Sequence, residues 1–303
     1  MKRCLVIHSS FDFLGGAEIL SLRMIHSLIL SGYSVDIIHI GRDLDVEKVS
    51  VWSNIDLDPK YITDLNFLGK FALNKLFLNK KASLLRYSLA LRISNLFKND
   101  YDKVVSTYGE LTLNNLGGKG FQFIHAPLFG LKNDQLEFLG YNKSSMLSLL
   151  IRKAYVQVSR LIASWSVSRV ESHIAIANSK WSADQVRNIY PKISINHSYI
   201  GASTKSFYNN IDLGAWWHKR KDSVVILGRV ARGKNIELAI NFIQEIRERG
   251  VDLNLVIVGN PENFEYENEL NSKIKNAGNH ISWFKGLSRE DMEELISTCK
   301  WGL

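Results

Sequence analysis

Residues 224–240 have the sequence VVILGRVARGKNIELAI, which predicts a β-strand, a glycine-containing loop and an α-helix in direct succession. The first four residues form a continuous apolar run, and apolar residues recur at helical spacing from Ile236 onward. Gly228 and Gly233 allow the intervening backbone to turn tightly and to approach a ligand closely. The N-terminus of the predicted helix offers free N–H groups to an anion. We therefore expect an α/β fold with an anion-binding loop at this junction.

Two cations flank this loop, Arg229 and Lys234. An arginine contacts phosphate through a planar fork and a lysine through a point charge, which are the two usual ways of holding a diphosphate. The loop matches neither the Walker A motif nor the G-x-G-x-x-G fingerprint. The local pattern therefore leaves two interpretations open, a diphosphate site or a basic loop with a glycine C-cap.

The length and composition indicate the class of protein. A chain of 303 residues favours two domains, and 46% hydrophobic with 22% charged residues is ordinary for a globular protein. The net charge of +8 suits nucleic acid, an anionic membrane or phosphorylated ligands. Nucleic acid is disfavoured, because no zinc or helix-turn-helix signature occurs in the sequence. The two cysteines, Cys4 and Cys299, predict neither a disulfide nor a metal site and favour a reducing cytoplasm.

The N-terminal residues predict the same order of elements as residues 224–240. An apolar strand at 5–7 is followed by a loop with Gly15 and Gly16, a helix at 19–30 and a strand at 35–40. This order indicates a parallel sheet, whose strands bind ligands at their carboxyl ends. The two glycines are candidates for a ligand-facing helix start. The alternative is that they only make this start flexible, with Glu18 as a carboxylate that suits the helix dipole.

Further strands are predicted at 103–107, 121–127 and 174–177. His125 stands where the second of these strands runs into a loop, at the edge of the sheet where ligands bind. A single histidine at such a place is more often structural than catalytic, so position alone distinguishes it. A long basic helix is predicted over 144–171, and another helix from Trp181 to Tyr190 with Ser179 or Ser182 as its N-cap.

Residues 61–98 are basic and amphipathic, with no Asp or Glu between Asp64 and Asp100. A helical face of this stretch contains four apolar residues: Leu85, Leu89, Ile93 and Leu96. A basic amphipathic helix can lie on anionic lipid. It can equally be a helix with its apolar face in the core and its lysines in solvent. The sequence favours neither interpretation.

The stretch 192–220 is irregular, so we predict a first domain over 1–200, a linker over 201–222 and a second domain over 223–303. The second domain contains predicted strands at 224–227, 253–259 and 281–284, and helices at 236–249, 266–277 and 290–299. Residues 301–303 look like the opening of one more strand. Since a helix that leads into three residues of strand is an unusual ending, we expect a truncated version of a longer protein.

Taken in order, these pieces resemble the GT-B glycosyltransferases of the large retaining family 4. The similarity lies in six short segments: Gly15-Gly16-Ala17-Glu18, Asn178-Ser179 with Trp181, Gly228-Arg229 with Lys234-Asn235, Ile257-Val258-Gly259, Phe284-Lys285-Gly286 and the helix from Asp291 to Cys299. The resemblance implies two Rossmann-like domains with parallel sheets, the first on the acceptor side and the second an incomplete nucleotide-sugar-binding domain. The segment His125-Ala126-Pro127 is similar to members that glycosylate lipid-linked acceptors.

The resemblance implies transfer of a sugar from a UDP- or GDP-sugar, with retention, to a glycan or a polyprenyl- or other lipid-linked acceptor. Arg229 and Lys234 would hold the donor diphosphate, and His125 would be catalytic beside the donor sugar. Gly15, Gly16 and Gly259 would complete the nucleotide-sugar site. No cofactor or metal is expected besides the nucleotide-sugar co-substrate. The expected location is cytoplasmic, with a peripheral position at the cytoplasmic face of the membrane if the basic stretch binds lipid.

One family feature does not occur in the sequence. The Glu-x7-Glu pair of the family would lie beyond the strand at 301–303, and so would its C-terminal crossing helix. The alternative function is therefore a catalytically inactive remnant, or a non-catalytic membrane-associated binding subunit that retains part of a nucleotide site.

Overall fold

The computed structural model describes residues 1–12, 15–66, 82–130, 146–201 and 217–303. The described residues up to 201 form one compact unit and those from 217 onward form a second. Each unit is a parallel sheet covered by helices, so the predicted α/β fold with two parallel sheets is confirmed. The second sheet begins at Lys221, inside the stretch that we predicted as the linker.

The sheet of the first unit has the strand order β3-β2-β1-β4-β5-β6-β7, with all neighbouring strands parallel. The described strands of this sheet are β1 (Lys2–Ile7), β2 (Tyr33–Ile38), β3 (Ile62–Asp64), β4 (Lys103–Ser106), β5 (Gly120–Ile124), β6 (Ile174–Ala177) and β7 (Ile195–His197). In β1 alternate side chains enter two different hydrophobic clusters, Cys4 and Val6 on one face and Leu5 and Ile7 on the other. The sheet is therefore buried on both faces.

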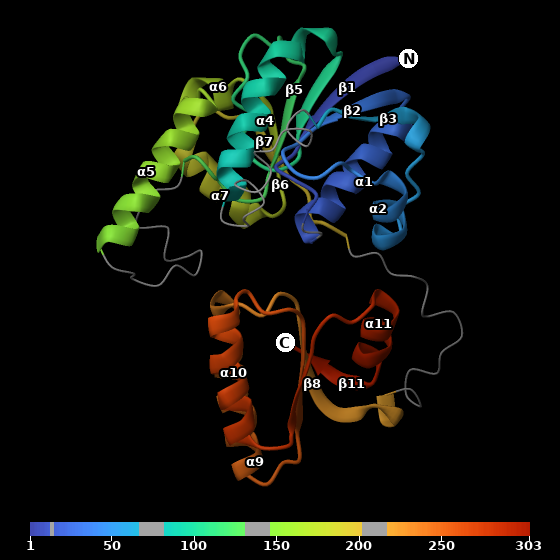
Figure 1. The fold of residues 1–303 in the computed structure, drawn as a ribbon, viewed down its shortest axis with the longest axis vertical. Helices are drawn as coiled ribbons and strands as arrows, with labels where there is room; N and C mark the ends of the chain where they lie inside the picture. The colour runs from blue at the N-terminus through green and yellow to red at the C-terminus, as the bar shows by residue number, and fades with distance from the viewer. Residues whose placement is uncertain (13–14, 67–81, 131–145, 202–216) are drawn as a thin grey trace. The chain divides into compact units, whose positions relative to one another are not determined.

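Helices cover both faces of this sheet (Figure 1). Helices α1 (Gly16–Leu30) and α2 (Val46–Ser53) pack on the face that contains Cys4 and Val6. Helix α4 (Ser83–Phe97) packs on the opposite face through Tyr87, Ala90 and Leu91. The remaining described helices of the unit are α5 (Met146–Ile162), α6 (Val167–Glu171) and α7 (Lys180–Ile189), with short 3-10 turns at Pro59–Tyr61 and Lys98–Asp100. Consecutive crossovers thus lie on one face until the strand order reverses between β3 and β4, as in other doubly wound folds.

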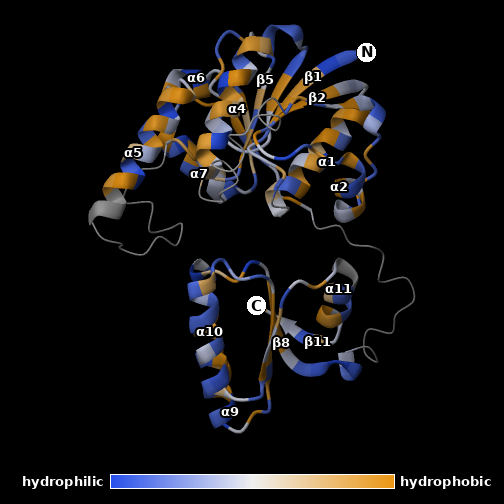
Figure 2. Ribbon diagram, in the orientation of Figure 1, coloured by the Kyte–Doolittle hydropathy of each residue, from blue (hydrophilic) through white to orange (hydrophobic). Residues whose placement is uncertain are grey.

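The second unit has the strand order β10-β9-β8-β11, again parallel throughout. Its strands are β8 (Lys221–Leu227), β9 (Asn254–Val258), β10 (Ile281–Phe284) and β11 (Cys299–Gly302). Helices α9 (Ile236–Glu248) and α10 (Phe264–Ala277) cover one face, and α11 (Arg289–Ser297) covers the other. The outer surface of α10 is largely hydrophilic, whereas the strands that it covers are mostly apolar (Figure 2). The amphipathic pattern of the sequence therefore corresponds to burial on the sheet.

Three sequence-based predictions were wrong in detail. The predicted helix 290–299 ends at Ser297, and Cys299 opens β11, whose Trp301 pairs with Val224 of β8. The stretch predicted as irregular contains β7, because Ile195 pairs in parallel with Ala175 of β6. The predicted long helix over 144–171 is interrupted near Ser164, which has a φ of 51°.

The predicted amphipathic face of residues 61–98 is confirmed only in part. Residues 67–81 lie outside the described part of the chain, but α4 is clear. Leu96 is 78% exposed, whereas Arg86, Tyr87 and Leu91 are buried. Leu89 and Ile93 pack against the core as predicted, so the buried face overlaps the predicted one and also includes an arginine near the N-terminal end of the helix. Among the described helices, none has the length and hydropathy that crossing a membrane requires.

Candidate functional site

Two glycine loops meet at the carboxyl ends of β8 and β9. Gly228 and Gly259 directly follow these strands with φ angles of 138° and 149°, which residues with side chains rarely adopt. A Cβ atom on Gly259 would overlap the carbonyl oxygen of Gly228. The N–H of Gly228 donates to the carbonyl of Val258 at 3.0 Å, and that of Val230 donates to the carbonyl of Asn260 at 3.0 Å. The structure thus places Gly259, a predicted site residue, against the Gly228 loop.

Arg229 and Lys234, the predicted diphosphate ligands, are both exposed on the Gly228 loop. Within the described part of the chain, neither side chain forms an ion pair. Arg232, the third cation of the loop, lies 2.6 Å from the Glu269 carboxylate and 4.9 Å from the centre of the Tyr266 ring. Arg232 is therefore held by the protein itself, whereas Arg229 and Lys234 are available to an anion.

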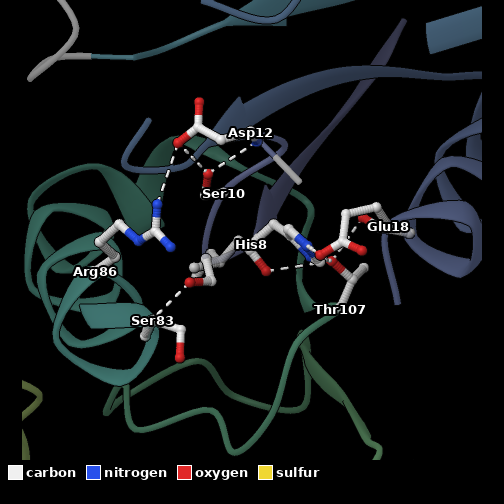
Figure 3. A network of polar contacts seen from close by, with 10 residues as sticks. His8, Ser10, Asp12, Glu18, Ser83, Arg86 and Thr107 are labelled. Carbon is white, nitrogen blue, oxygen red and sulfur yellow. Dashed lines mark hydrogen bonds and ion pairs between the residues drawn. The ribbon is translucent and has the colours of Figure 1, made fainter. Parts of the chain in front are cut away.

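A second polar cluster lies at the carboxyl ends of β1 and β4 in the first unit (Figure 3). His8 follows β1, Thr107 follows β4, and Glu18 lies in the first turn of α1. The Nδ1 atom of His8 lies 2.9 Å from the Oγ1 atom of Thr107, and its Nε2 atom lies 3.7 Å from the Oε1 atom of Glu18. The hydroxyl of Ser21 extends this row, 2.8 Å from the Thr107 hydroxyl. Three elements thus converge on one imidazole.

His125, the predicted catalytic residue, follows β5 and belongs to the same cluster. The Thr107 backbone and the charges of His8 and Glu18 all influence the pKa of its ring. Burial lowers the pKa of His125, and burial likewise lowers the pKa of His8 against the opposing effect of Glu18. Both imidazoles are therefore neutral near pH 7 and act as hydrogen-bonding groups rather than as cations.

Gly15 and Gly16 begin α1 beside this cluster. Gly15 is the N-cap residue in an extended conformation, and a Cβ atom there would lie 3.1 Å from the Oε2 atom of Glu18. A Cβ atom on Gly16 would meet nothing within 4 Å. Gly15 therefore makes room for the Glu18 carboxylate, whereas Gly16 leaves the helix terminus uncovered.

A buried ion pair holds the loop that leads to these glycines. The Asp12 carboxylate lies 3.1 Å from the Arg86 guanidinium, with both side chains 3% exposed (Figure 3). The same carboxylate accepts hydrogen bonds from the Ser10 hydroxyl at 2.7 Å and from the N–H of Arg42 at 2.8 Å. Asp12 therefore connects the loop after β1 to the loop after β2 and to α4.

Sequence reasoning missed part of this first-unit cluster. His8 was not among the predicted site residues, and Glu18 was treated as a carboxylate that suits the helix dipole. The available signal was the position of His8, at the same edge of the sheet as His125. Of the predicted site residues, Gly15, Gly16 and His125 lie in the first unit, and Arg229, Lys234 and Gly259 lie in the second.

Known proteins are similar to this chain in fold and, for the second unit, in sequence. Residues 216–301 match the family model described as Glycosyl transferases group 1. WaaG, a glycosyltransferase involved in lipopolysaccharide biosynthesis, aligns with a TM-score of 0.62 at 14% identity over 98% of this chain and 73% of its own. TarM of S. aureus, solved with fondaparinux, alpha-GlcNAc-glycerol and UDP, aligns with a TM-score of 0.61 at 9% identity over 100% of this chain and 80% of its own.

A UDP-N-acetylglucosamine 2-epimerase from Rickettsia bellii also shares the fold, with a TM-score of 0.53 at 14% identity over 100% of this chain and 73% of its own. Comparison with curated proteins gives no match. The fold by itself therefore does not separate sugar transfer from epimerisation, but the family match does favour transfer. Residues 216–301 are thus similar in sequence to the glycosyl transferases group 1, within a chain that shares the GT-B fold of WaaG and TarM.

Proposed function

We propose that this glycosyltransferase moves a sugar from a UDP- or GDP-sugar to a glycan or a lipid-linked acceptor, with retention at the anomeric carbon. The main support is the Gly228 loop, where Arg229 and Lys234 are exposed and free of ion pairs in the described residues. The backbone of Arg229 lies next to Gly259, and Lys234 stands on the same loop, at the carboxyl end of a parallel sheet, where α/β folds bind nucleotides.

In this proposal Arg229 and Lys234 hold the donor diphosphate. They neutralise the negative charge that develops on the leaving nucleotide when the bond to the anomeric carbon breaks. Two cations supply this neutralisation, so the proposed reaction uses no cofactor beyond the nucleotide sugar. Gly259 lets the second loop approach the same phosphates, because no side chain stands between them.

His125 is the proposed catalytic residue beside the donor sugar, with Gly15 and Gly16 at the neighbouring helix start. Since burial keeps the His125 imidazole neutral, it can accept or donate a hydrogen bond to a sugar hydroxyl. The first unit is the proposed acceptor side. This assignment rests on the resemblance in sequence and on the position of His125 at the carboxyl end of β5.

We further propose that the protein lies at the cytoplasmic face of an anionic membrane. Helix α5 carries four exposed apolar side chains, Leu150, Ile151, Val158 and Leu161, each at least half exposed. Basic residues accompany them on the same helix, Lys153 among them. An exposed apolar surface with adjacent lysines and arginines is typical of interfacial helices. A lipid-linked acceptor would then be presented at the same surface.

Calorimetric titration with UDP and with GDP tests the diphosphate site. Arg229→Ala and Lys234→Ala should each weaken binding by roughly 10- to 150-fold, since a charge-assisted hydrogen bond contributes about 1.5–3 kcal/mol. Arg232→Ala is the matched control, because it removes the same charge from the same loop while its guanidinium is already paired with Glu269. Equal affinity in wild type, Arg229→Ala and Lys234→Ala would contradict the assignment. Nucleotide binding without sugar transfer would favour a non-catalytic binding subunit.

A further inference from the structure

Glu18 is an unusual first-turn carboxylate. Acidic residues near a helix N-terminus normally face solvent, as Glu47 does in the first turn of α2. The Glu18 side chain is only 14% exposed and turns toward the carboxyl end of β1, where its Oε1 atom lies 3.7 Å from His8 Nε2 (Figure 3). Its pairing with a histidine, rather than with water, indicates a role beyond the helix dipole.

The partner histidine has one unused nitrogen. His8 is completely buried, and its Nδ1 atom is engaged by the Thr107 hydroxyl at 2.9 Å. Its Nε2 atom has no hydrogen-bond partner, because Glu18 at 3.7 Å is beyond hydrogen-bond distance. The buried Nε2 atom of His125 likewise lacks a partner. Since buried polar atoms are nearly always hydrogen-bonded, two such imidazole nitrogens, one of them 3.7 Å from the Glu18 carboxylate, indicate a place for a polar ligand.

The surroundings suit a carbohydrate. The His8 ring is stacked on Phe11, with centroids 4.6 Å apart, and the partly buried Tyr108 ring meets it edge-on at 5.3 Å. Gly15 leaves the space beside the carboxylate free, because a Cβ atom there would lie 3.1 Å from Glu18 Oε2. Aromatic rings beside a few well-placed polar groups are the usual lining of a site for small organic ligands.

We propose that Glu18 and His8 form a subsite for one sugar hydroxyl, an inference that rests on the proposed glycosyltransferase function. The hydroxyl donates to the Glu18 carboxylate and accepts a hydrogen bond from the His8 Nε2–H group, which is otherwise unsatisfied. A hydroxyl can fill both roles because it is donor and acceptor at once. The Thr107 hydroxyl fixes the orientation of His8 from the opposite side of the ring.

The hydroxyl could belong to the donor sugar or to the acceptor, and binding measurements separate the two. For the donor, calorimetry compares UDP-glucose, UDP-N-acetylglucosamine and GDP-mannose with UDP and GDP alone. For the acceptor, saturation-transfer NMR follows methyl glucoside, methyl mannoside and N-acetylglucosamine in the presence of the bare nucleotide. The variants are Glu18→Gln, which keeps the shape of the side chain, and Glu47→Gln, which removes the same charge from the first turn of another helix in the same unit.

Glu18→Gln should reduce the sugar-dependent affinity roughly tenfold or more in one of the two measurements, and that measurement identifies the source of the hydroxyl. Binding of UDP or GDP alone should not change, and Glu47→Gln should behave as wild type throughout. The same sugar-dependent affinity in Glu18→Gln and wild type, or none in wild type by either method, would overturn the subsite. A wild-type protein that binds neither UDP nor GDP would instead contradict the proposed function.

Discussion

A Cβ atom on Gly259 would overlap the carbonyl oxygen of Gly228, so the loops that follow β8 and β9 can pack together only through backbone. The contact is supported from β10 as well, because the N–H of Gly259 donates to the Phe284 carbonyl at 3.0 Å and Trp283 Nε1 donates to the Gly259 carbonyl at 2.9 Å. Three parallel strands therefore fix the shape of the loop that carries Arg229.

Gly259→Ala should separate the two loops. The methyl group has no space and the φ of 149° disfavours any side chain, so the loop must shift at a cost of about 1–3 kcal/mol in unfolding free energy. We also expect loss of nucleotide binding, measured by calorimetry alongside urea unfolding. Gly302→Ala is the control, because a Cβ atom there meets nothing within 4 Å. If Gly259→Ala binds UDP as wild type does, the loop contact is irrelevant to the site.

The Asp12–Arg86 pair should be essential to the first unit. Both side chains are 3% exposed, and removal of one partner leaves a buried charge, which typically costs about 3–5 kcal/mol. Asp12→Ala should therefore lower the unfolding free energy by about this amount in urea titrations. The exposed pair Arg187–Asp184 provides the comparison, since Arg187→Ala should cost less than about 1 kcal/mol. Similar small losses in both variants would show that the buried pair is not a structural anchor.

Much of the architecture was readable from the sequence because the buried strands are nearly continuous apolar runs. The runs at 224–227 and 281–284 correspond to β8 and β10, and Ser179 caps α7 through a hydrogen bond from Ser182 N at 3.1 Å. The short edge strands β3 and β7 were missed, because a strand of three residues has no usable periodicity. Their existence depends on pairing with β2 and β6, which is a tertiary property.

The residues of the candidate site that stand on one short segment of the chain could be grouped from the sequence. The contacts that form only when distant segments fold together could not. Arg229 and Lys234 stand on one loop, so their proximity could be inferred from spacing alone. The Glu18–His8 contact joins α1 to β1 across a loop, and the Asp12–Arg86 pair joins residues far apart in the chain. A buried arginine in a basic stretch such as 61–98 is indistinguishable by sequence from its solvated neighbours.

Helix α5 should carry the membrane affinity of the protein. The double substitution Leu150→Ser with Ile151→Ser removes two apolar side chains that are 53% and 62% exposed. It should reduce co-sedimentation with phosphatidylserine liposomes, and raised salt should reduce the wild-type signal, since each basic group near the surface contributes about 1 kcal/mol. The control removes Leu30 and Val51, which are 75% and 84% exposed on other helices. Equal, negligible binding of wild type to neutral and anionic liposomes would exclude the membrane proposal.

Stability should fall as the pH is lowered from neutral, because buried histidines resist protonation. Burial lowers the pKa of His8, of His125 and of His173 in the folded state. Below the ordinary histidine pKa of about 6.5 the unfolded chain therefore binds protons that the folded chain does not, and each such proton lowers the unfolding free energy by up to about 1.4 kcal/mol per pH unit. Glu110 makes a contribution of opposite sign to the pH dependence of stability. Burial raises its pKa, so the folded state holds its proton to higher pH than the unfolded chain does.

Comparison of wild type with His173→Gln isolates the contribution of His173 to the pH dependence of stability. His173 lies in the first unit, with its Nε2 atom 2.7 Å from the Leu113 carbonyl, and a glutamine amide can keep that hydrogen bond without titrating. Because Glu110 contributes equally to both proteins, its effect cancels in the difference. Urea unfolding between pH 7.5 and 5.5 should show a shallower loss of stability in His173→Gln. The slope of the unfolding free energy against pH should differ from that of wild type by the equivalent of up to one bound proton. Parallel pH profiles would mean that His173 titrates alike in the folded and unfolded states, against the effect of its burial beneath Gly120.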